Sequence, residues 1–184
     1  MRREIRISGS GGQGIIMAGY LLGKAATIYD GKIATQVQSY GPEARGGASR
    51  AEVIISDDDV YYPYIQMADV FISLSQLGYE KYRRDVKKDS MTFIDPVFVS
   101  PVNNNCLKIP ATTEAIELGS KIVTNMVMLG AVAEITKVVT IEALEKSIRS
   151  SLQERLQKIN IDALRRGREI GIEMMESQKM EMGD

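Results

Sequence analysis

The sequence contains no histidine, no tryptophan and only one cysteine, Cys106, among its 184 residues. Without histidine it cannot supply a Ser-His-Asp triad, a histidine general base or a histidine-ligated metal site. A single thiol cannot close a disulfide within the chain, complete a structural zinc site or hold an iron–sulfur cluster. We therefore expect no metal centre and no catalytic residue in this sequence, and we interpret Cys106 as an unreactive thiol in a reducing compartment.

The sequence also lacks an excess of charge of either sign and any long apolar run. Its 23 basic and 24 acidic residues give a formal net charge of −1, so no surplus of positive charge is available to follow a nucleic-acid backbone. No apolar segment reaches the roughly 18 residues that cross a bilayer, and residues 1–5 begin a strand-like pattern rather than a signal peptide. These absences predict a cytoplasmic protein that binds neither nucleic acid nor membrane.

The first part of the chain has the alternating strand and helix pattern of an α/β protein. Residues 3–8 alternate polar and apolar side chains, a glycine-rich turn occupies 9–14, and residues 15–29 carry apolar side chains at helical spacing. A second strand is expected over 32–39. If it runs parallel to the first, the loops after both strands leave the sheet at the same edge, where α/β folds place their binding sites. Further expected elements are strands at 49–55, 70–74 and 91–95, a surface helix at 76–87, and short strands near Phe98 and Leu107.

The second part of the chain is helical in pattern. The expected helices lie at 112–119, 122–136, 141–157 and 161–178. Thr140 and Asn160 occupy the N-cap positions of the last two helices. In the helix at 141–157, apolar side chains three or four residues apart form one stripe: Ile141, Leu144, Ile148, Leu152 and Leu156.

Together these patterns predict a three-layer α/β/α sandwich of Rossmann-like type, with a mostly parallel or mixed central sheet and a helical C-terminal part. In this prediction residues 1–184 form a single domain. Its α/β part spans 1–111, and its helical part, 112–184, packs on the α/β part.

The turn at 9–14 has the spacing of a dinucleotide-binding fingerprint, with Gly9, Gly11 and Gly14 placed between a strand and a helix. Glycines let the backbone approach an anion, and the helix N-terminus offers N–H groups to it. A Rossmann site also needs an acidic residue at the end of the second strand, where this sequence has Gln38 and Ser39. No P-loop pattern occurs. A stand-alone NAD- or flavin-binding protein is therefore an alternative, not the main interpretation.

A second glycine-rich segment begins where the second expected strand ends. It contains Glu43 and Arg45, and Arg45 would bring a fixed cation and a forked donor beside the backbone N–H groups of the first loop. Gln13 adds an amide donor and acceptor to the first loop. We predict that the two loops form a shared ligand-binding or subunit-interface site; the alternative is a pair of structural turns. The candidate residues are Gly9, Ser10, Gly11, Gly12, Gln13, Gly14, Ser39, Tyr40, Gly41, Pro42, Glu43, Arg45, Gly46 and Gly47.

Residues 57–64 contain three consecutive aspartates and then Tyr61, Tyr62 and Tyr64. We interpret the aspartates as a solvated loop end rather than a metal site. The tyrosines either pack with their hydroxyls facing water or form an interface with another protein, since tyrosine is enriched at interfaces.

Both glycine-rich segments, at this separation, resemble those of a known family. The runs Gly9-Ser10-Gly11-Gly12-Gln13-Gly14-Ile15 and Gln38-Ser39-Tyr40-Gly41-Pro42-Glu43-Ala44-Arg45-Gly46-Gly47-Ala48-Ser49 are similar to the gamma subunits of 2-oxoacid:ferredoxin oxidoreductases. The resemblance extends over essentially the whole chain. Ser10 and the segment 41–47 depart from the pyruvate type and look closer to the 2-oxoglutarate, succinyl-CoA-forming type. The 2-oxoisovalerate, indolepyruvate and pyruvate enzymes remain alternatives.

This resemblance implies a non-catalytic subunit of an enzyme that converts 2-oxoglutarate and CoA to succinyl-CoA and CO2 while it reduces ferredoxin. It implies that thiamine diphosphate, Mg²⁺ and 4Fe–4S clusters are carried by other subunits. The implied partners are the alpha, beta and ferredoxin-like delta subunits, with ferredoxin as the electron acceptor of the complex. In this chain the run Asn103-Asn104-Asn105 lacks the preceding Gly-Asp-Gly of a thiamine signature, so we interpret it as a turn.

Overall fold

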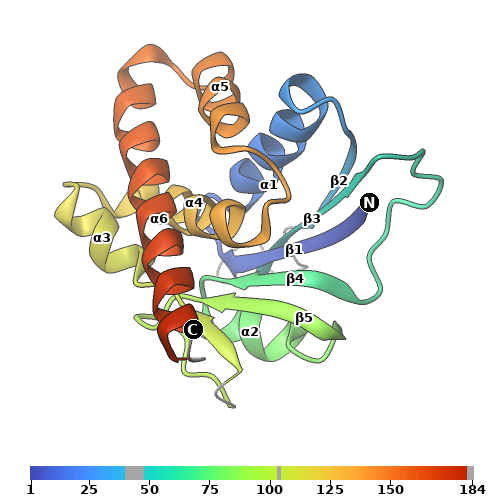
Figure 1. The fold of residues 1–184 in the computed structure, drawn as a ribbon, viewed down its shortest axis with the longest axis horizontal. Coiled ribbons are helices and arrows are strands. Elements are labelled where there is room, and N and C mark those ends of the chain that lie inside the picture. Colours follow the sequence, from blue (N-terminus) through green and yellow to red (C-terminus); the bar gives the residue numbers. More distant parts are fainter. Residues whose placement is uncertain (40–47, 103–104, 182–184) are drawn as a thin grey trace.

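The computed structural model describes residues 1–39, 48–102 and 105–181, which form a sheet with helices on both faces (Figure 1). Six strands are hydrogen-bonded in the order β2-β3-β1-β4-β5-β6. Their bounds are β1 Arg2–Ser10, β2 Ile33–Ser39, β3 Ala48–Ser56, β4 Ala68–Ser73, β5 Val86–Ile94 and β6 Cys106–Lys108. From β1 to β6 the neighbouring strands are parallel, whereas β3 is antiparallel to both β1 and β2. The predicted α/β fold with a mixed central sheet is confirmed.

The strands β1 and β2 run in the same direction, although they are not neighbours. Each is antiparallel to β3, which lies between them: Ser10 pairs with Ala48, and Ser39 pairs with Arg50. The carboxyl ends of β1 and β2 therefore lie at the same edge of the sheet, as the sequence predicted. What the sequence pattern did not indicate is that β3 returns between them.

Helices cover the two faces of the sheet unequally. Their bounds are α1 Ile15–Lys24, the π-helical η1 Ala25–Tyr29, α2 Gln76–Tyr82, α3 Ala111–Glu117, the 3-10 helical η2 Lys121–Val123, α4 Thr124–Thr136, α5 Ile141–Ser151 and α6 Glu154–Glu181. Alternate strand residues point to opposite faces: Ile5 and Ile72 join the core that contains α1, α4 and α5, whereas Phe71 packs against α2. Figure 1 shows α1 and α5 on one side of the sheet and α2 on the other.

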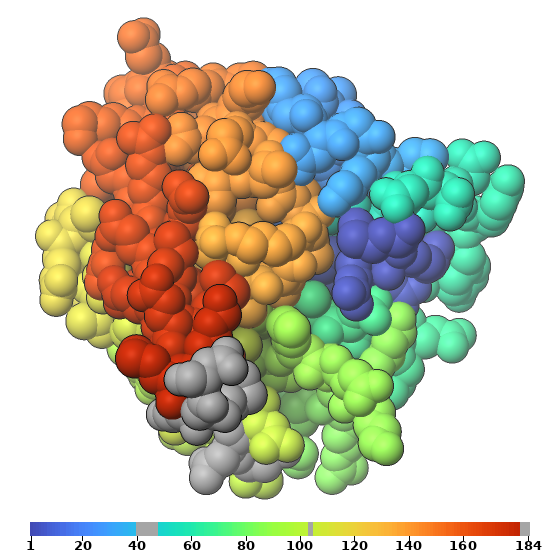
Figure 2. Space-filling view, viewed as in Figure 1, coloured from blue at the N-terminus to red at the C-terminus, as the bar shows by residue number. Residues whose placement is uncertain are grey.

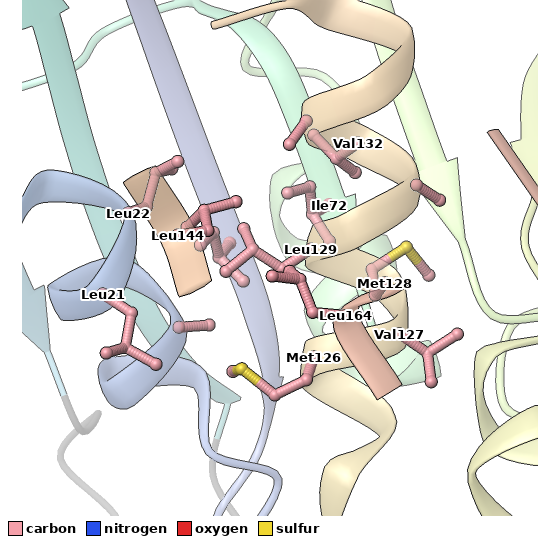
Figure 3. Close-up of a cluster of buried hydrophobic side chains, with 14 of the residues drawn as sticks. Leu21, Leu22, Ile72, Met126, Val127, Met128, Leu129, Val132, Leu144 and Leu164 are labelled. Atoms are coloured by element: carbon pink, nitrogen blue, oxygen red, sulfur yellow. The ribbon is translucent and has the colours of Figure 1, made fainter. Parts of the chain in front are cut away.

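The larger core lies between the sheet and the helical part. Leu21 and Leu22 of α1, Leu129 of α4, Leu144 of α5 and Leu164 of α6 converge in it (Figure 3), and each is at most 2% exposed. Burying such a side chain stabilises the fold by about 1.5–3 kcal/mol relative to leaving it in water. In Figure 2 the helices α5 and α6, orange to red, cover much of the visible face. The helical part thus shares its core with β1 and β4.

The helices α4 and α6 approach each other through glycines. A Cβ atom added at Gly130 would lie 2.0 Å from the carbonyl oxygen of Leu164, and one at Gly167 would lie 1.9 Å from that of Val127. Neither distance is compatible with a side chain. The two glycines therefore fix how closely the helices pack.

The predicted helix at 141–157 is wrong in its extent. The helix α5 ends at Ser151, where Leu152 takes an extended conformation, and α6 starts at Glu154. The Gln157 side-chain amide donates to the carbonyls of Arg149 and Leu152, at 2.9 and 3.0 Å, and so satisfies the end of α5. The predicted apolar stripe therefore breaks: Ile141, Leu144 and Ile148 are buried on α5, whereas Leu156 is 42% exposed on α6.

The two predicted N-caps have different outcomes. Thr140 caps α5, because its hydroxyl accepts a hydrogen bond from the backbone N–H of Ala143 at 3.1 Å. Asn160 is not an N-cap. It lies within α6, where its amide donates to the carbonyl of Leu156. Only two residues separate α5 from α6, so the apolar periodicity continues almost unbroken across the gap. For this reason the pattern assigned the first residues of α6 to the preceding helix and predicted the start of α6 too late.

The region around β5 also differs from its prediction. The helix predicted over 76–87 ends at Tyr82, and β5 begins at Val86. The predicted strand near Leu107 is β6, but Phe98 lies in a turn. Asp95 stabilises that turn. Its backbone carbonyl accepts hydrogen bonds from the N–H groups of Phe98 and Val99, and its carboxylate accepts one from the N–H group of Val97. These N–H groups are therefore not available to pair with a neighbouring strand.

Candidate functional site

The topological switch point of the sheet lies between β1 and β4. At such a point the helices that follow two neighbouring parallel strands cover opposite faces of the sheet. These parallel neighbours pair up to Ser8 and Ser73. After β1 the chain enters α1 on one face, and after β4 it enters α2 on the other face. In open α/β sheets the crevice at such a switch point is the usual binding site.

A hollow of about 690 Å³ lies at this position. Its walls come from the loop after β1, the loop after β4, the turn after β5, and the start of the helical part. The lining residues are Ser10, Gly11, Gly12, Gln13, Leu74, Ser75, Gln76, Leu77, Phe98, Lys121, Ile122 and Thr124.

The Gln13 side chain braces the two walls of this hollow. Its Oε1 accepts a hydrogen bond from the backbone N–H of Ser10 at 2.7 Å, and its Nε2 donates to the carbonyl of Leu74 at 2.7 Å. One amide therefore links the end of β1 to the end of β4. The sequence predicted that Gln13 contributes a donor and an acceptor to the loop, and the structure directs both of them to backbone groups.

The positions of the first loop differ in why the structure favours glycine there. Gly12 and Gly14 have φ values of +87° and +68°, which favour glycine. A Cβ on Gly14 would also lie 2.3 Å from the Nδ2 atom of Asn125, which donates to the Gly14 carbonyl at 3.1 Å. A Cβ on Gly9 would lie 2.6 Å from Oε1 of Gln13. Gly11 has open space around its Cα and lines the hollow.

The surface of the hollow is largely apolar, with a few polar groups. Leu77 and Ile122 are 48% and 80% exposed, and Lys121 places its ammonium 4.7 Å from the centre of the Phe98 ring. Ser75 at the floor caps α2 by accepting from the N–H of Gly78 at 3.1 Å. Exposed apolar side chains grouped beside a hollow are typical of a surface that meets another molecule.

The structure brings together part of the predicted site. Ser10, Gly11, Gly12 and Gln13 line the hollow, and Gly9 and Gly14 shape the same loop. Ser39 ends β2 at the same sheet edge. The predicted residues Tyr40, Gly41, Pro42, Glu43, Arg45, Gly46 and Gly47 lie outside the described residues. Ala48, the first described residue after them, pairs with Ser10.

The sequence reasoning missed the walls that come from later segments. Leu74, Ser75 and Leu77 follow β4, and Lys121 and Ile122 precede α4. The one available signal was Ser75, a good N-cap residue directly after the predicted strand at 70–74. Nothing local in the sequence indicates that residues 11 and 122 line the same hollow.

The segment 57–64 lies away from this site, beyond the opposite ends of β1 and β3, where Arg2 pairs with Ser56. All three aspartates are exposed, which confirms the prediction of a solvated loop end. Tyr61, Tyr62 and Tyr64 are 90%, 57% and 54% exposed, and Tyr62 and Tyr64 meet edge to face at 5.4 Å. The role of the tyrosines as an interface stays a prediction.

Residues 4–170 match the family described as pyruvate ferredoxin/flavodoxin oxidoreductase. The chain belongs to this family. It is 47% identical, over 97% of its length and 100% of the relative, to the 2-oxoglutarate synthase subunit KorC of Methanothermobacter marburgensis. It is 32% identical to the pyruvate synthase subunit PorC of Methanocaldococcus jannaschii, over 87% of this chain and 92% of that one.

A solved structure agrees with this membership of the pyruvate ferredoxin/flavodoxin oxidoreductase family. The gamma subunit of a keto/oxoacid ferredoxin oxidoreductase from Geobacter sulfurreducens PCA is 40% identical and superimposes with a TM-score of 0.84. The match covers 94% of this chain and 97% of that one. The predicted resemblance to gamma subunits is thereby confirmed.

Among residues 1–39, 48–102 and 105–181 no three Asp, Glu or Cys side chains are grouped so that they could hold a metal ion. In the same part of the chain, no helix combines the length and the apolar character needed to cross a membrane.

Proposed function

We propose that this chain is the non-catalytic gamma subunit of a 2-oxoglutarate:ferredoxin oxidoreductase. The assembled enzyme would convert 2-oxoglutarate and CoA to succinyl-CoA and CO2 and pass the two electrons to ferredoxin. The substrate assignment rests on sequence identity. The chain is 47% identical to a 2-oxoglutarate synthase subunit over that subunit's full length, but 32% identical to a pyruvate synthase subunit. The 2-oxoisovalerate, indolepyruvate and pyruvate enzymes are the competing assignments.

In this proposal the reactive groups belong to other subunits. Thiamine diphosphate, Mg²⁺ and 4Fe–4S clusters would be held by the alpha, beta and delta subunits, and CoA would be a substrate of the complex. A chain with no histidine and one cysteine cannot ligate a 4Fe–4S cluster by itself. Residues 1–184 would act as one domain, supported by the core that the helical part shares with β1 and β4.

We further propose that the hollow between β1 and β4 is where this subunit meets its catalytic partners, and that both glycine-rich segments belong to this surface. Three features support this role: its place at the switch point of the sheet, the brace formed by Gln13, and the exposed side chains of Leu77 and Ile122. Backbone N–H groups of the loop at 9–14 suit a phosphate or a carboxylate that approaches through a partner subunit.

The test is to assay the isolated chain and the co-expressed complex with 2-oxoglutarate, pyruvate, 2-oxoisovalerate and indolepyruvate, each with CoA and a viologen dye. We expect no turnover by the chain alone and the highest kcat/KM of the complex for 2-oxoglutarate. Turnover by the isolated chain would refute the non-catalytic role. A preference of the complex for another 2-oxoacid would refute the assignment of 2-oxoglutarate as its substrate.

The docking role has its own matched pair of variants. Ile122→Glu places a charge at the hollow, whereas Ile28→Glu places one at a side chain that is 64% exposed elsewhere on the chain. We expect Ile122→Glu to reduce co-purification of the partner subunits and Ile28→Glu to leave it unchanged, with both chains folded by circular dichroism. Equal co-purification of the two variants would contradict the assignment of the surface.

The stand-alone cofactor-binding alternative predicts a different result. A coenzyme at a hundredfold excess over its Kd stabilises its protein by about 2.7 kcal/mol. We expect the melting temperature of the isolated chain to be insensitive to NAD, NADP, FAD and FMN. A marked stabilisation by one of them would favour the alternative.

A further inference from the structure

A second pocket, of about 300 Å³, lies between α2 and the strands β5 and β6. It shares no lining residue with the hollow at the switch point. Unlike that hollow, it is lined mainly by polar and charged side chains. These polar and charged side chains include Tyr79, Arg83, Lys88, Ser90, Thr92 and Asn105.

The pocket carries positive charge that neighbouring carboxylates do not cancel. Within the described part of the chain, no carboxylate lies within 4.0 Å of the charged nitrogen atoms of Arg83 or Lys88. Two neighbouring acidic residues have other partners: Glu80 accepts from Gln76, and Asp85 faces the buried Arg6. Two cations that share a polar pocket without a counter-ion are suited to an anionic ligand.

The third cation of the pocket, Lys87, is different. Its ammonium lies 2.9 Å from the carboxylate of Asp69 and 3.5 Å from that of Glu4. Its charge is therefore largely compensated, which leaves Arg83 and Lys88 as the two cations available to a ligand.

A buried hydroxyl belongs to the same pocket. Tyr79 is 2% exposed, and its Oη accepts a hydrogen bond from the backbone N–H of Val102 at 3.3 Å. That contact uses a lone pair of the phenolic oxygen, and the hydroxyl is also 4.0 Å from the sulfur of Cys106. A thiol sulfur is a weak acceptor, so a phosphate oxygen in the pocket would replace it as the partner of the phenolic proton. Burial raises the pKa of Tyr79 although Arg83 opposes the change, so the phenol stays protonated at neutral pH.

The remaining polar groups complete a set of donors. Ser90 and Thr92 of β5 contribute hydroxyls, and Asn105 contributes an amide that precedes β6. Cationic side chains, hydroxyls and an amide around one small volume match an anion with several acceptor oxygens at tetrahedral angles. A pocket of this volume has room for a small molecule but not for an extended polymer.

We propose that this pocket binds a small phosphate-bearing ligand, either inorganic phosphate or a phosphate monoester. Arg83 and Lys88 would neutralise its charge, and the hydroxyls of Tyr79, Ser90 and Thr92 would donate to its oxygens. This inference is independent of the proposed function, because the site is separate from the hollow at the switch point and can be tested on the chain alone.

The experiment is a titration of the ¹⁵N-labelled full chain with sodium phosphate, with sodium chloride at equal ionic strength as the reference. A second arm uses glycerol 3-phosphate, which distinguishes a monoester from the inorganic ion. We expect saturable shifts of the amide signals of Ser90, Thr92 and Asn105 with phosphate or its ester and none with chloride. Identical responses to phosphate and chloride would overturn the proposal.

Arg83 and Arg84 provide a matched pair of variants, because they are adjacent and of the same type but only Arg83 lines the pocket. Arg83→Gln should weaken phosphate binding by roughly tenfold, the usual effect of losing one charged donor. Arg84→Gln, which removes the same charge from an exposed position, should leave binding within about twofold. Equal losses in both variants would show only general electrostatic attraction and would refute a built site.

Two more measurements keep the proposal testable if Arg83→Gln fails to fold. Lys88→Gln removes the other cation from an exposed side chain and should also weaken phosphate binding, by roughly tenfold. A glutamate-rich peptide in place of phosphate tests for an acidic protein segment. Saturable binding of the peptide, with none of phosphate, would refute a small-molecule site.

Discussion

The guanidinium of Arg6 donates from Nε to the Oε1 atom of Glu52 at 2.8 Å, and both side chains are only 2% exposed. Its other nitrogens donate to the backbone carbonyls of Asp85 and Ile65, each at 2.8 Å. The pair lies across β1 and β3, while the carbonyls belong to the segments that lead into β4 and β5. One buried cation therefore connects four parts of the chain, and each of the three nitrogen atoms of its guanidinium donates a hydrogen bond.

Replacing Glu52 should leave this buried cation without its counter-ion. We expect Glu52→Ala to lower the free energy of unfolding by about 3–5 kcal/mol, the usual cost of breaking a buried ion pair. The control is Glu176→Ala on the exposed part of α6, which should change stability by less than about 0.5 kcal/mol. Urea denaturation at neutral pH measures both, and a similar effect of the two substitutions would contradict the role of the pair.

The contact between α4 and α6 should be intolerant of a single methyl group. Gly130→Ala places a Cβ 2.0 Å from a backbone oxygen, so the helices must separate, and overpacking of this kind costs about 1–3 kcal/mol. Gly23→Ala is the matched control, because its Cβ would meet only Val53, at 3.8 Å. That variant should gain up to about 1 kcal/mol from the higher helix propensity of alanine. Thermal unfolding should give shifts of opposite sign.

The brace formed by Gln13 should control the order of the loop at 9–14. Gln13→Ala removes both hydrogen bonds, to Ser10 and to Leu74, and should lower the free energy of unfolding by about 1–2 kcal/mol. Hydrogen exchange of the Ser10 amide should become faster than in the unmodified chain. Gln178→Ala, at an exposed position of α6, is the control. An unchanged exchange rate at Ser10 would show that the amide does not hold the loop.

Cys106 should react slowly with alkylating reagents. Burial raises the pKa of its thiol, and the hydrogen bond from Tyr79 and the charge of Lys108 oppose this only in part. The thiolate is the reactive form, so the rate with iodoacetamide should continue to rise with pH above the range where an exposed cysteine has levelled off. Comparison with the urea-unfolded chain over pH 7 to about 10 provides the reference.

The same shift has a consequence for stability. A thiol whose pKa is raised in the folded state favours folding below the unfolded pKa of about 8.5, and this contribution is lost as pH rises through the folded pKa. Cys106→Ser should therefore reduce the fall in stability between pH 8 and about 10. An equal alkaline fall in both chains would indicate that the thiol is not responsible.

The sequence by itself determined the local elements and the family. Alternation over 3–8 and helical spacing over 15–29 reflect neighbours a few residues apart, and these elements appear where they were expected. The two glycine-rich segments indicated the family because particular residues at a fixed separation are a linear pattern. The carboxyl ends of β1 and β2 were correctly placed at one edge of the sheet, because strand direction follows from the order of strand, helix and strand.

Only the tertiary structure decided which distant residues meet. Gln13 and Leu74, Gly14 and Asn125, and Arg6 and Glu52 are 61, 111 and 46 residues apart in the sequence. Their contacts depend on strand order, register and helix packing, which are set by burial of the whole core. The break between α5 and α6 depends in the same way on the side chain of Gln157, which satisfies carbonyls in the preceding helix. Local periodicity contains no information on such contacts, because the free energy that selects them comes from long-range packing.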